Sequence, residues 1–381
     1  MNFDLEPKYK DIQTAALDLT RKIEPMAVEA DSLSVVHGGV LEALKASGLC
    51  RLMVPAKYGG TFDSIDPLAI CVAREAMMAT SSHLDSLFAL QGIGSYAITV
   101  AGSDAQRSEW LPRIAKLEAL GALALTEEMA GSDLKAVSTE IQQTDNGLLL
   151  NGSKSYISNA GASSYFIVFA KEDRGYSTVL VPANTPGVAT KPSPELIAPH
   201  VLGDVFFENV ILPESARLGR PGDGLQNALA TLGVFRVSVA GAAVGLAQAA
   251  LDEAVRHTST RIQFGRPLAK LGPVAQMLAD CWTEIEMARL ITYRAADMAC
   301  EDPSASLNQS SMAKLAASEM ASRVVDRCVQ MMGRWGLESQ SKIERLYRQA
   351  RPMRIYEGSS EVLRLGIAKQ LIAEKQSTVN C

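Results

Sequence analysis

A mainly α-helical α+β fold in three parts is predicted, because the character of the sequence changes twice along the chain. Residues 1–120 read as mostly helical, with a Pro/Gly loop at Met53–Thr61 and an apolar helical pattern at Pro67–Met78. Residues 121–224 contain short β-rich runs, and residues 225–381 return to long helical patterns. We therefore expect an N-terminal α-helical domain, a middle β domain and a four-helix-like C-terminal domain.

The composition excludes several classes of protein. A length of 381 residues and a hydrophobic content of 47% allow a large buried core divided among two or three domains. The net charge is −5 with both signs mixed, so the basic stripe of a nucleic-acid binder is missing. The six cysteines form no CxxC pair and none of the four histidines stands at ligand spacing from another. We expect neither a disulfide framework nor a metal site.

A cytoplasmic location is predicted. No apolar run approaches the ~20 residues that cross a bilayer. The first residues, MNFDLEPKYKD, carry acidic side chains and no apolar segment, unlike a signal or transit peptide. We expect no membrane insertion.

Three short runs in the middle part predict strands at Tyr165–Ala170, Ser177–Val181 and Val205–Leu212. Asn151-Gly152 stands between the runs Leu148–Leu150 and Lys154–Ser158. Because both residues tolerate positive φ, the pair predicts a hairpin turn at that point.

Two long helices are predicted in the C-terminal part. Steps of three and four mark one buried face of the first helix, through Leu278, Trp282, Ile285, Ala288, Ile291, Ala295 and Met298. Asp302-Pro303-Ser304 predicts a loop, and Ser311–Met331 predicts the next helix.

The segment Leu125–Leu134, LTEEMAGSDL, opens the β part and is the first candidate binding segment. Its Ala-Gly pair lets the backbone approach a flat ligand closely. Thr126 and Ser132 offer hydroxyls that could bond a flavin ring edge or a phosphate-bearing tail. The alternative is a plain turn with Asp133 as a cap.

The segment Gly152–Ala160, GSKSYISNA, alternates Tyr156 and Ser158 along a predicted strand. Tyr156 could stack on an isoalloxazine ring, and Ser158 could present its hydroxyl to the ring nitrogen N5. An ordinary hairpin strand is the alternative.

The segment Arg261–Leu268, RIQFGRPL, follows a long predicted helix. Arg261 and Arg266 accompany an aromatic residue and a Gly-Arg-Pro turn. This combination suits a diphosphate, because guanidinium groups form paired charge-assisted hydrogen bonds. Alternatively, the arginines satisfy the last carbonyls and the dipole of the helix.

Near the C-terminus, QMMGRWG at Gln330–Gly336 is followed by IYEGSSEVLR at Ile355–Arg364. Ser359 is the predicted cap of the last helix, and the helix dipole explains Glu361 in its first turn. Glu357 precedes the cap in a tight glycine turn, where its carboxylate can point into a cavity. A solvated loop glutamate is the alternative. The core-facing residues of that helix are expected to be Val362, Leu365 and Ile372.

Taken together, these segments resemble the acyl-CoA dehydrogenase family, in the same order and over nearly the whole chain. LTEEMAGSD resembles the family's LTEPGAGSD segment, and SYISNAG resembles its flavin-contacting strand. FENVILPESARLG, followed by GDG, looks like the junction before the C-terminal helices, and FRVSVAGAAVGLAQAALDEA resembles the substrate-lining helix. RIQFGRPL resembles the dinucleotide segment and IYEGSSEVLR the catalytic segment.

The resemblance implies the acyl-CoA dehydrogenase fold, with a β-barrel-like middle domain, a C-terminal four-helix bundle and FAD bound between these two domains. The residues implied to bind FAD are Leu123, Leu125, Thr126, Ser132, Tyr156, Ser158, Arg261, Gln263, Phe264, Gln330, Gly333, Arg334, Ser359 and Glu361. A homo-oligomer, usually a tetramer, is also implied. The residues that would reach the FAD of a neighbouring subunit are Arg261, Phe264, Gln330 and Gly333.

The implied reaction is the α,β-dehydrogenation of an acyl-CoA thioester to the trans-2-enoyl-CoA. Glu357 would remove the α-proton, and the β-hydrogen would pass as hydride to flavin N5. The Glu357 amide and a flavin ribityl hydroxyl would stabilise charge on the thioester oxygen. Electron-transfer flavoprotein is the implied acceptor. Phe235 stands where some relatives carry the base, so Glu357 is the single candidate. The residues implied to contact the substrate are Ser132, Arg236, Tyr356 and Gly358.

The sequence departs from the family pattern at several positions, which bear on the substrate more than on the reaction class. Glu128-Met129 occupies the place where the family usually has Pro-Gly. Arg334-Trp335 replaces the small residues that the family has near the FAD diphosphate. Gly233 replaces an acidic residue, Gln349 replaces Asp, and Pro199–Gly203 replaces a Ser/Thr-rich stretch. Two alternatives remain. One is a flavoenzyme of the same fold that reduces an enoyl-CoA or eliminates a β-substituent, and the other is a non-catalytic helical interaction protein.

Overall fold

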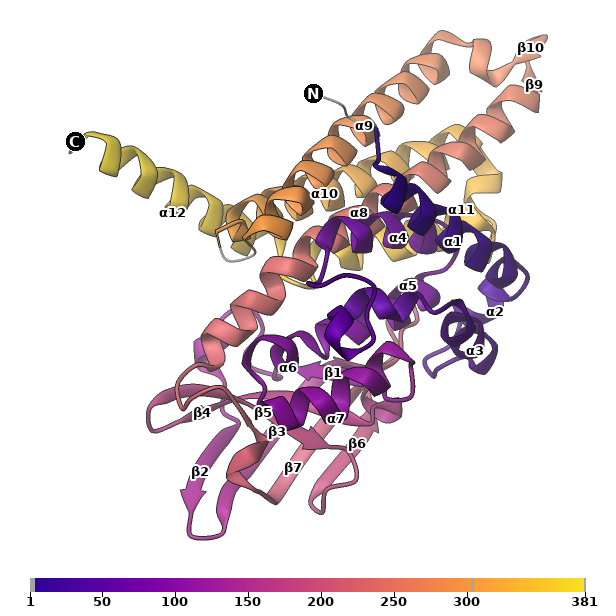
Figure 1. Cartoon of the computed structure of the whole chain (residues 1–381). Helices are drawn as coiled ribbons and strands as arrows, with labels where there is room; N and C mark the ends of the chain where they lie inside the picture. Colours follow the sequence, from indigo (N-terminus) through magenta and orange to yellow (C-terminus); the bar gives the residue numbers. More distant parts are fainter. Residues whose placement is uncertain (1–3, 303–304, 380–381) are drawn as a thin grey trace. The chain divides into compact units, whose positions relative to one another are not determined.

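The computed structural model describes residues 4–302 and 305–379, which form two compact units (Figure 1). One unit comprises residues 1–31, 67–82 and 236–381, and the other comprises residues 32–66 and 83–235. The division falls inside one long helix, α8 (Gly224–Thr260), between Phe235 and Arg236. We call them the helical unit and the sheet unit.

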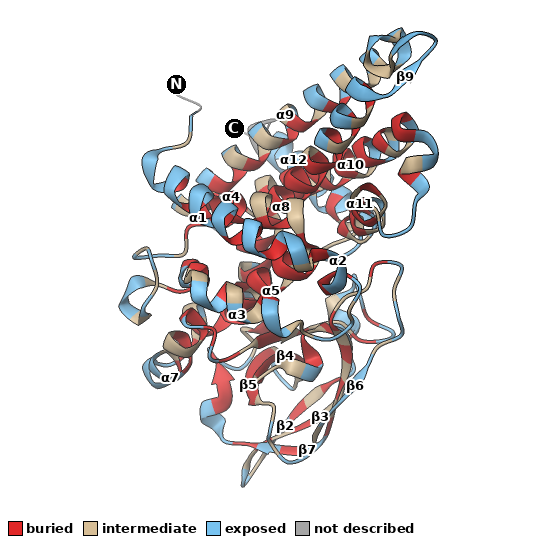
Figure 2. Ribbon diagram, turned by 90° about the vertical axis from the view of Figure 1, so that its right-hand side faces the viewer, coloured by how far each residue is buried: buried red, intermediate tan, exposed pale blue. Residues whose placement is uncertain are grey.

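The helical unit consists of α-helices joined by short turns. Its helices are α1 (Pro7–Ile23), α2 (Ala27–Ala30), α4 (Pro67–Thr80), α8 from Arg236 onward, α9 (Gly272–Glu301), α10 (Leu307–Met332), α11 (Lys342–Ala350) and α12 (Ser360–Val379). Helix α10 packs against α9, α11 and α12, and α4 packs against α1 and α9. A hairpin of β9 (Ile262–Gln263) and β10 (Arg266–Pro267) joins α8 to α9 (Figure 1). Most of these helices have one buried and one exposed face, as expected for amphipathic sequences (Figure 2).

Two glycines determine how closely α8 packs against α4. A Cβ atom at Gly241 would lie 2.8 Å from the carbonyl oxygen of Cys71, and one at Gly245 would lie 1.9 Å from that of Glu75. Both distances are shorter than van der Waals contact between carbon and oxygen. Only glycine therefore allows the two helix backbones to approach this closely.

Helix α8 is also the most apolar long element. Among residues 4–302 and 305–379, it is the one helix long and apolar enough to cross a membrane by length and composition, with a mean hydropathy of 1.7 over 18 residues. On that criterion, the prediction that no apolar run approaches membrane-spanning length is wrong. However, 83% of that window is buried inside the protein. Packing against neighbouring helices explains this composition, because a helix buried on all sides is apolar all round.

The sheet unit is built on one eight-stranded sheet with helices beside it. Its strands are β1 (Gly121–Ala124), β2 (Glu140–Thr144), β3 (Gly147–Ser158), β4 (Tyr165–Glu172), β5 (Gly175–Pro182), β6 (Val188–Pro192), β7 (Leu202–Leu212) and β8 (Arg217–Leu218). The order is β6-β7-β3-β2-β4-β5-β8, and β1 pairs in parallel with β4. Its other helices are α3 (Gly38–Ser47), α5 (Ser82–Ile93), α6 (Tyr96–Ala101) and α7 (Asp104–Ala115).

Strand β4 is buried on both faces, because successive side chains point to opposite sides of the sheet. Tyr165 and Ile167 pack in a core with Trp110 of α7, whereas Phe166 and Val168 pack with apolar residues of β3 and β7. All four strand side chains are fully buried. Burial on both faces explains why the run YFIVFA is apolar apart from the Tyr165 hydroxyl.

The expected fold class, mainly helical α+β with a β domain in the middle of the chain, is confirmed by these elements. Strands β4, β5 and β7 cover the three predicted runs, α4 covers Pro67–Met78 and α10 covers Ser311–Met331. Pro303 and Ser304, where a loop is expected, lie outside the described residues. Strand β1 begins at Gly121 and α8 begins at Gly224, while the domain boundaries at 120/121 and 224/225 stay a prediction.

The hairpin expected at Asn151-Gly152 is wrong. Strand β3 runs through this pair, and a β-bulge between Leu150 and Gly152 accommodates the Gly152 φ of 139°. The turn lies instead at Asp145-Asn146, where β2 ends opposite Gly147. The chain contains two Asn-Gly pairs five residues apart, and the local signal is the same for both.

Three residues expected on buried helix faces are exposed. Trp282 of α9 is 63% exposed, and Leu365 and Ile372 of α12 are 72% and 56% exposed. Ile285 on the same face of α9 is buried as expected, and Leu363 is the buried apolar residue among the described side chains of α12. The apolar spacing of α9 and α12 thus includes residues that the rest of the chain does not cover.

The close contact of α8 with α4 generates a stability prediction. Gly245→Val should lower Tm by several degrees, because overpacking a helix contact costs about 1–3 kcal/mol or more. Thermal unfolding followed by circular dichroism measures the change. Gly366→Ala in α12 is the matched control, since a Cβ atom there meets nothing within 4 Å. An unchanged Tm for Gly245→Val would show that the two helices separate without cost.

Candidate active site

Glu357, the candidate base, lies in a strained turn immediately before α12. Its φ is 53° and that of Gly358 is 104°, both in the left-handed region. A residue with a side chain rarely adopts this conformation, so the surrounding structure must hold Glu357 in place. Ser359 caps α12, and its hydroxyl accepts a hydrogen bond from the Val362 amide at 3.4 Å. Glu361 follows, exposed, in the first turn.

Two cationic side chains bind consecutive carbonyls of this turn. Arg236 of α8 donates from Nε to the Glu357 carbonyl at 2.8 Å, and Lys314 of α10 donates from Nζ to the Gly358 carbonyl at 2.7 Å. Charged donors make shorter and stronger hydrogen bonds than neutral ones. A Cβ atom at Gly358 would lie 3.2 Å from the Arg236 guanidinium, which is a tight contact, and the φ of 104° would strain any residue with a side chain at this position. We call these two side chains and two carbonyls the base-loop clamp.

The clamp also sets the electrostatics around Glu357. The Lys314 side chain is fully buried, and burial lowers its pKa to about 8, while Glu357 raises it and Arg236 lowers it. Burial lowers the pKa of Arg236 too, and Glu357 again opposes the shift. Both cations are mainly protonated at neutral pH, so the Glu357 carboxylate lies in the field of two positive charges.

Arg236 and Tyr356 were expected at the substrate. In the structure, Arg236 binds the Glu357 carbonyl instead, and its Nη1 also lies 3.4 Å from the Ser311 hydroxyl. Tyr356 precedes the base and is 39% exposed. Contact of either side chain with a substrate stays a prediction.

In the sheet unit, a buried ion pair ties the segment LTEEMAGSDL to β3. Glu127 lies 2.9 Å from Lys154, with side chains 6% and 0% exposed. Lys154 also donates to the Leu125 carbonyl at 3.0 Å, and the Ser155 amide donates to the Thr126 carbonyl at 2.9 Å. The backbone carbonyls of Leu125 and Thr126 are therefore both fixed from β3.

Hydrogen bonds keep the Glu127 carboxylate ionised. Ser138 donates from its amide and its hydroxyl, both at 2.6 Å, and the Thr139 amide donates at 3.0 Å. Burial by itself would raise the pKa of Glu127, but these bonds and Lys154 lower it to about 2. Burial lowers the pKa of Lys154 to about 8 against the effect of Glu127. At neutral pH the pair is therefore charged on both sides.

The other residues expected at the flavin ring lie on β1, on β3 and in the loop between β1 and β2. Tyr156 occupies an irregular stretch of β3, with a φ of 56° and an exposed fraction of 51%. Ser158 ends β3, and its hydroxyl lies 3.0 Å from Nε2 of His200. Leu123 of β1 is partly buried, and Ser132 is exposed.

The residues expected at the dinucleotide lie on the β9–β10 hairpin and at the end of α10. Phe264, at the hairpin tip with a φ of 50°, is 89% exposed. The Arg261 guanidinium lies 4.6 Å from the centre of the Trp335 ring, and that of Arg334 lies 4.4 Å from the same ring. Trp335 thus joins the hairpin to the end of α10. The remaining residues of this set, all exposed, are Gln263, Gln330 and Gly333.

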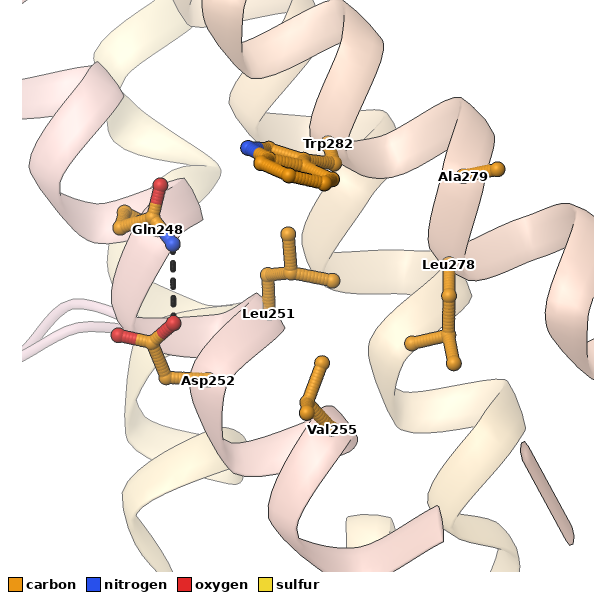
Figure 3. Close-up of a pocket in the computed structure, with 7 residues that line it drawn as sticks. All are labelled: Gln248, Leu251, Asp252, Val255, Leu278, Ala279 and Trp282. Carbon is orange, nitrogen blue, oxygen red and sulfur yellow. Dashed lines mark hydrogen bonds between the residues drawn. The ribbon is translucent and has the colours of Figure 1, made fainter. Parts of the chain in front are cut away.

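A groove of about 260 Å³ lies between α8 and α9 (Figure 3). Figure 3 shows Leu278 and Trp282 of α9 facing Leu251 and Val255 of α8. None of the expected site residues lines this groove, which belongs to the exposed apolar face of α9. In residues 4–302 and 305–379, no group of three His, Cys, Asp or Glu side chains is placed to hold a metal ion.

Family profiles match nearly the whole chain. The N-terminal, middle and C-terminal domains of acyl-CoA dehydrogenases match residues 7–118, 122–210 and 222–372. The chain therefore belongs to the acyl-CoA dehydrogenase family, and the resemblance found in its motifs is confirmed.

Relatives and solved structures agree with this family. A cyclohex-1-ene-1-carbonyl-CoA dehydrogenase from Geobacter metallireducens is 35% identical over 361 residues, which cover 93% of this chain and 94% of the relative. A 3-(aryl)acrylate reductase from Clostridium sporogenes is 35% identical over 364 residues, 92% and 95% of the two chains. The structure of butyryl-CoA dehydrogenase from Megasphaera elsdenii has a TM-score of 0.93 and 30% identity, covering 98% of this chain and 100% of that one.

The same comparisons establish the cofactor and the general activity. A glutaryl-CoA dehydrogenase from Mycobacterium smegmatis in complex with FADH2 has a TM-score of 0.90 and 25% identity, covering 96% of this chain and 95% of that one. This chain is a flavoprotein oxidoreductase that uses FAD and dehydrogenates acyl-CoA.

Three buried charged residues, Lys314 in the helical unit and Glu127 and Lys154 in the sheet unit, were missed from the sequence. A signal for Lys314 was present, because it occupies the apolar face of the predicted helix Ser311–Met331 between Ala313 and Ala317. A charged side chain on a buried face needs a partner. The partner, a backbone carbonyl 44 residues away, leaves no trace in the sequence.

The base-loop clamp generates a kinetic prediction. Lys314→Met should keep FAD but lower kcat about 10- to 100-fold with a smaller change in KM, because losing a buried charged hydrogen bond costs about 1.5–3 kcal/mol and frees the turn. Steady-state kinetics with an acyl-CoA and an artificial acceptor measure this split. Lys270→Met, at an exposed lysine, is the control. A wild-type kcat in Lys314→Met would contradict a positioning role.

The Glu127 network generates a prediction about pH. The folded-state pKa of about 2 lies below the ordinary 4.5, so the carboxylate stabilises the fold fully above pH 4.5 and loses this effect as the pH falls toward 2. Glu127→Gln should therefore lower Tm most at neutral pH, and its difference from wild type should shrink on acidification. Tm measured against pH tests this, with the exposed neighbour Glu128→Gln as control. A difference independent of pH would refute the assignment.

Proposed function

We propose that this chain catalyses FAD-dependent α,β-dehydrogenation of an acyl-CoA thioester to the trans-2-enoyl-CoA, with Glu357 removing the α-proton. The observation that carries this is the base-loop clamp. A glutamate in a left-handed turn, with charged donors on its own carbonyl and the next, has its backbone held in one conformation, which fixes the point from which its side chain extends. General-base catalysis needs such a fixed group close to the proton that it takes.

The residues of the chain fit the expected cofactor. At Gly131, φ is not positive and a Cβ atom would meet nothing within 4 Å, so the fold does not itself require glycine there. Close approach of a flat ligand accounts for it. Tyr156 adds a half-exposed aromatic ring in a fixed left-handed conformation. FAD, when bound, supplies the acceptor for the hydride.

The proposed FAD contacts are Leu123, Leu125, Thr126, Ser132, Tyr156, Ser158, Arg261, Gln263, Phe264, Gln330, Gly333, Arg334, Ser359 and Glu361. The proposed substrate contacts are Ser132, Arg236, Tyr356 and Gly358, and the Glu357 amide would donate to the thioester oxygen. Because Arg236 already binds the Glu357 carbonyl, we propose that it holds the base in addition to contacting the substrate. Residues 1–120, 121–224 and 225–381 are the proposed domains.

We infer a homotetramer in which the dinucleotide set reaches the FAD of a neighbouring subunit. An aromatic side chain with 89% exposure, Phe264, is costly in water and suits an intersubunit contact. The exposed apolar side chains of α9, Trp282, Met287 and Leu290, support the same conclusion. Electron-transfer flavoprotein as the acceptor and a cytoplasmic location without membrane insertion are parts of this proposal. The burial of α8 supports the latter.

Reduction of an enoyl thioester is the second candidate, because the Clostridium sporogenes relative is named a reductase. In that direction a protonated Glu357 would return a proton to the α-carbon. Turnover of a panel of saturated thioesters with an electron acceptor, compared with turnover of their enoyl forms with a reductant, separates the two directions.

Replacement of the base tests the main proposal. Glu357→Gln should retain FAD but bleach on the order of 10²–10⁴-fold more slowly when acyl-CoA is added without oxygen, because the amide cannot take the proton. Stopped-flow absorbance of the flavin measures the rate. Glu338→Gln, at an exposed position, serves as the control and should bleach normally. Full-rate bleaching of Glu357→Gln would remove this residue from the mechanism.

A further inference from the structure

A histidine side chain lies beside the hydroxyl of Ser158. Nε2 of His200 is 3.0 Å from Ser158 Oγ and 3.3 Å from Ser86 Oγ. Ser158 is the last residue of β3, Ser86 lies on α5, and His200 lies in the loop before β7. All three belong to the sheet unit. One ring nitrogen thus connects a strand, a helix and a loop.

The loop that carries His200 is fixed against β3. The Asn159 amide donates to the Val201 carbonyl at 2.8 Å, and Ser158 pairs with Leu202 in the register of β3 and β7. Val201, next to His200, is buried. The backbone of His200 cannot leave Ser158 without breaking this pairing, so their contact is a stable property of the unit.

His200 carries no charge at neutral pH. Burial and the neighbouring His83 lower its pKa to about 4. His83 is itself held on α5, where its Nε2 accepts a hydrogen bond from the His37 amide at 3.0 Å. A neutral imidazole has one N–H donor and one nitrogen acceptor. His200 therefore acts on Ser158 through the direction of a hydrogen bond rather than through charge.

We infer that His200 orients the Ser158 hydroxyl and is thereby a positioning residue for the edge of the FAD ring that Ser158 is proposed to contact. This inference rests on the proposed function. A serine hydroxyl has a single proton. If Nε2 accepts that proton, the oxygen offers only lone pairs to its next neighbour, and if Nε2–H donates, the Ser158 proton is available.

The direction of this hydrogen bond determines whether the oxidised or the reduced form of the flavin is stabilised. The ring nitrogen N5 is a hydrogen-bond acceptor in oxidised flavin and an N–H donor in reduced flavin. A hydroxyl held as an acceptor favours the reduced form, and one held as a donor favours the oxidised form. His200 lies in Pro199–Gly203, the stretch that stands where the family resemblance leads us to expect Ser/Thr-rich sequence.

The midpoint potential of bound FAD tests the inference on the full-length holoenzyme. We expect His200→Leu to change the ratio of reduced to oxidised flavin about tenfold at a fixed potential, which is about 30 mV for a two-electron couple. Ser158→Ala should shift the potential as well, and His200→Leu added to it should cause no further shift. Ser86→Ala, which removes the other hydroxyl on the same nitrogen, should change the ratio less than about twofold.

His200→Gln is the conservative variant, since its amide nitrogen reaches the position of Nε2, and it should restore most of the wild-type potential. If His200→Leu does not fold, His200→Ala carries the test, because it also removes Nε2 and should shift the potential in the same direction. An unchanged potential in the variant that lacks Nε2, or additive shifts when it is combined with Ser158→Ala, would overturn the inference while leaving the Ser158 contact intact. If Ser158→Ala changes neither the potential nor FAD retention, the proposed contact is wrong and the inference falls with it. The Glu357 experiment is independent of that outcome.

Discussion

The hydrogen bonds from Arg236 and Lys314 to two consecutive carbonyls are the constraint on which the candidate active site depends. A glutamate in the left-handed region costs on the order of 1–3 kcal/mol. One hydrogen bond from a charged donor contributes about 1.5–3 kcal/mol, so two of them exceed this cost. The turn at Glu357 and Gly358 is therefore the stable arrangement. The base is held through its backbone, which leaves its side chain to react.

The sheet unit uses a buried lysine in the same way. Lys154 donates to the Leu125 carbonyl, as Lys314 donates to that of Gly358. The difference lies in the charge balance. Lys154 has a direct partner in Glu127 at 2.9 Å, whereas the charge of Lys314 is opposed mainly by the field of Glu357. Removing either member of the first pair leaves a buried charge behind, which is costly. Removing Lys314 acts chiefly on the geometry of the base.

Helix α8, which carries Arg236, packs closely against α4 because two of its residues are glycines. Gly241 and Gly245 bring the backbone of α8 against α4, and a contact between two backbones leaves few rotamers that could relax it. Directly after α10, the ring of Trp335 packs against the guanidinium groups of Arg261 and Arg334. This contact gives a structural role to the Arg-Trp pair that departs from the family's small residues. The apolar side chains of α9 that remain exposed support the proposed contact with a neighbouring subunit.

By itself the sequence determined what depends on neighbours along the chain. Periodicity identified α4, α10 and β4, and the Gly-Ser turn before the last helix singled out Glu357. The two Asn-Gly pairs predict a hairpin turn equally well, and only the pairing of β3 with β2 and β7 determines which of them lies at the turn. Tertiary structure alone decided the contacts between residues far apart in sequence, such as Arg236 with Glu357, Lys314 with Gly358 and His200 with Ser158. It also left Trp282 in solvent, because helical spacing marks an apolar face but not what covers it. The reason is physical: a side chain's burial and partners are set by whichever elements fold against it, and those elements lie elsewhere in the chain.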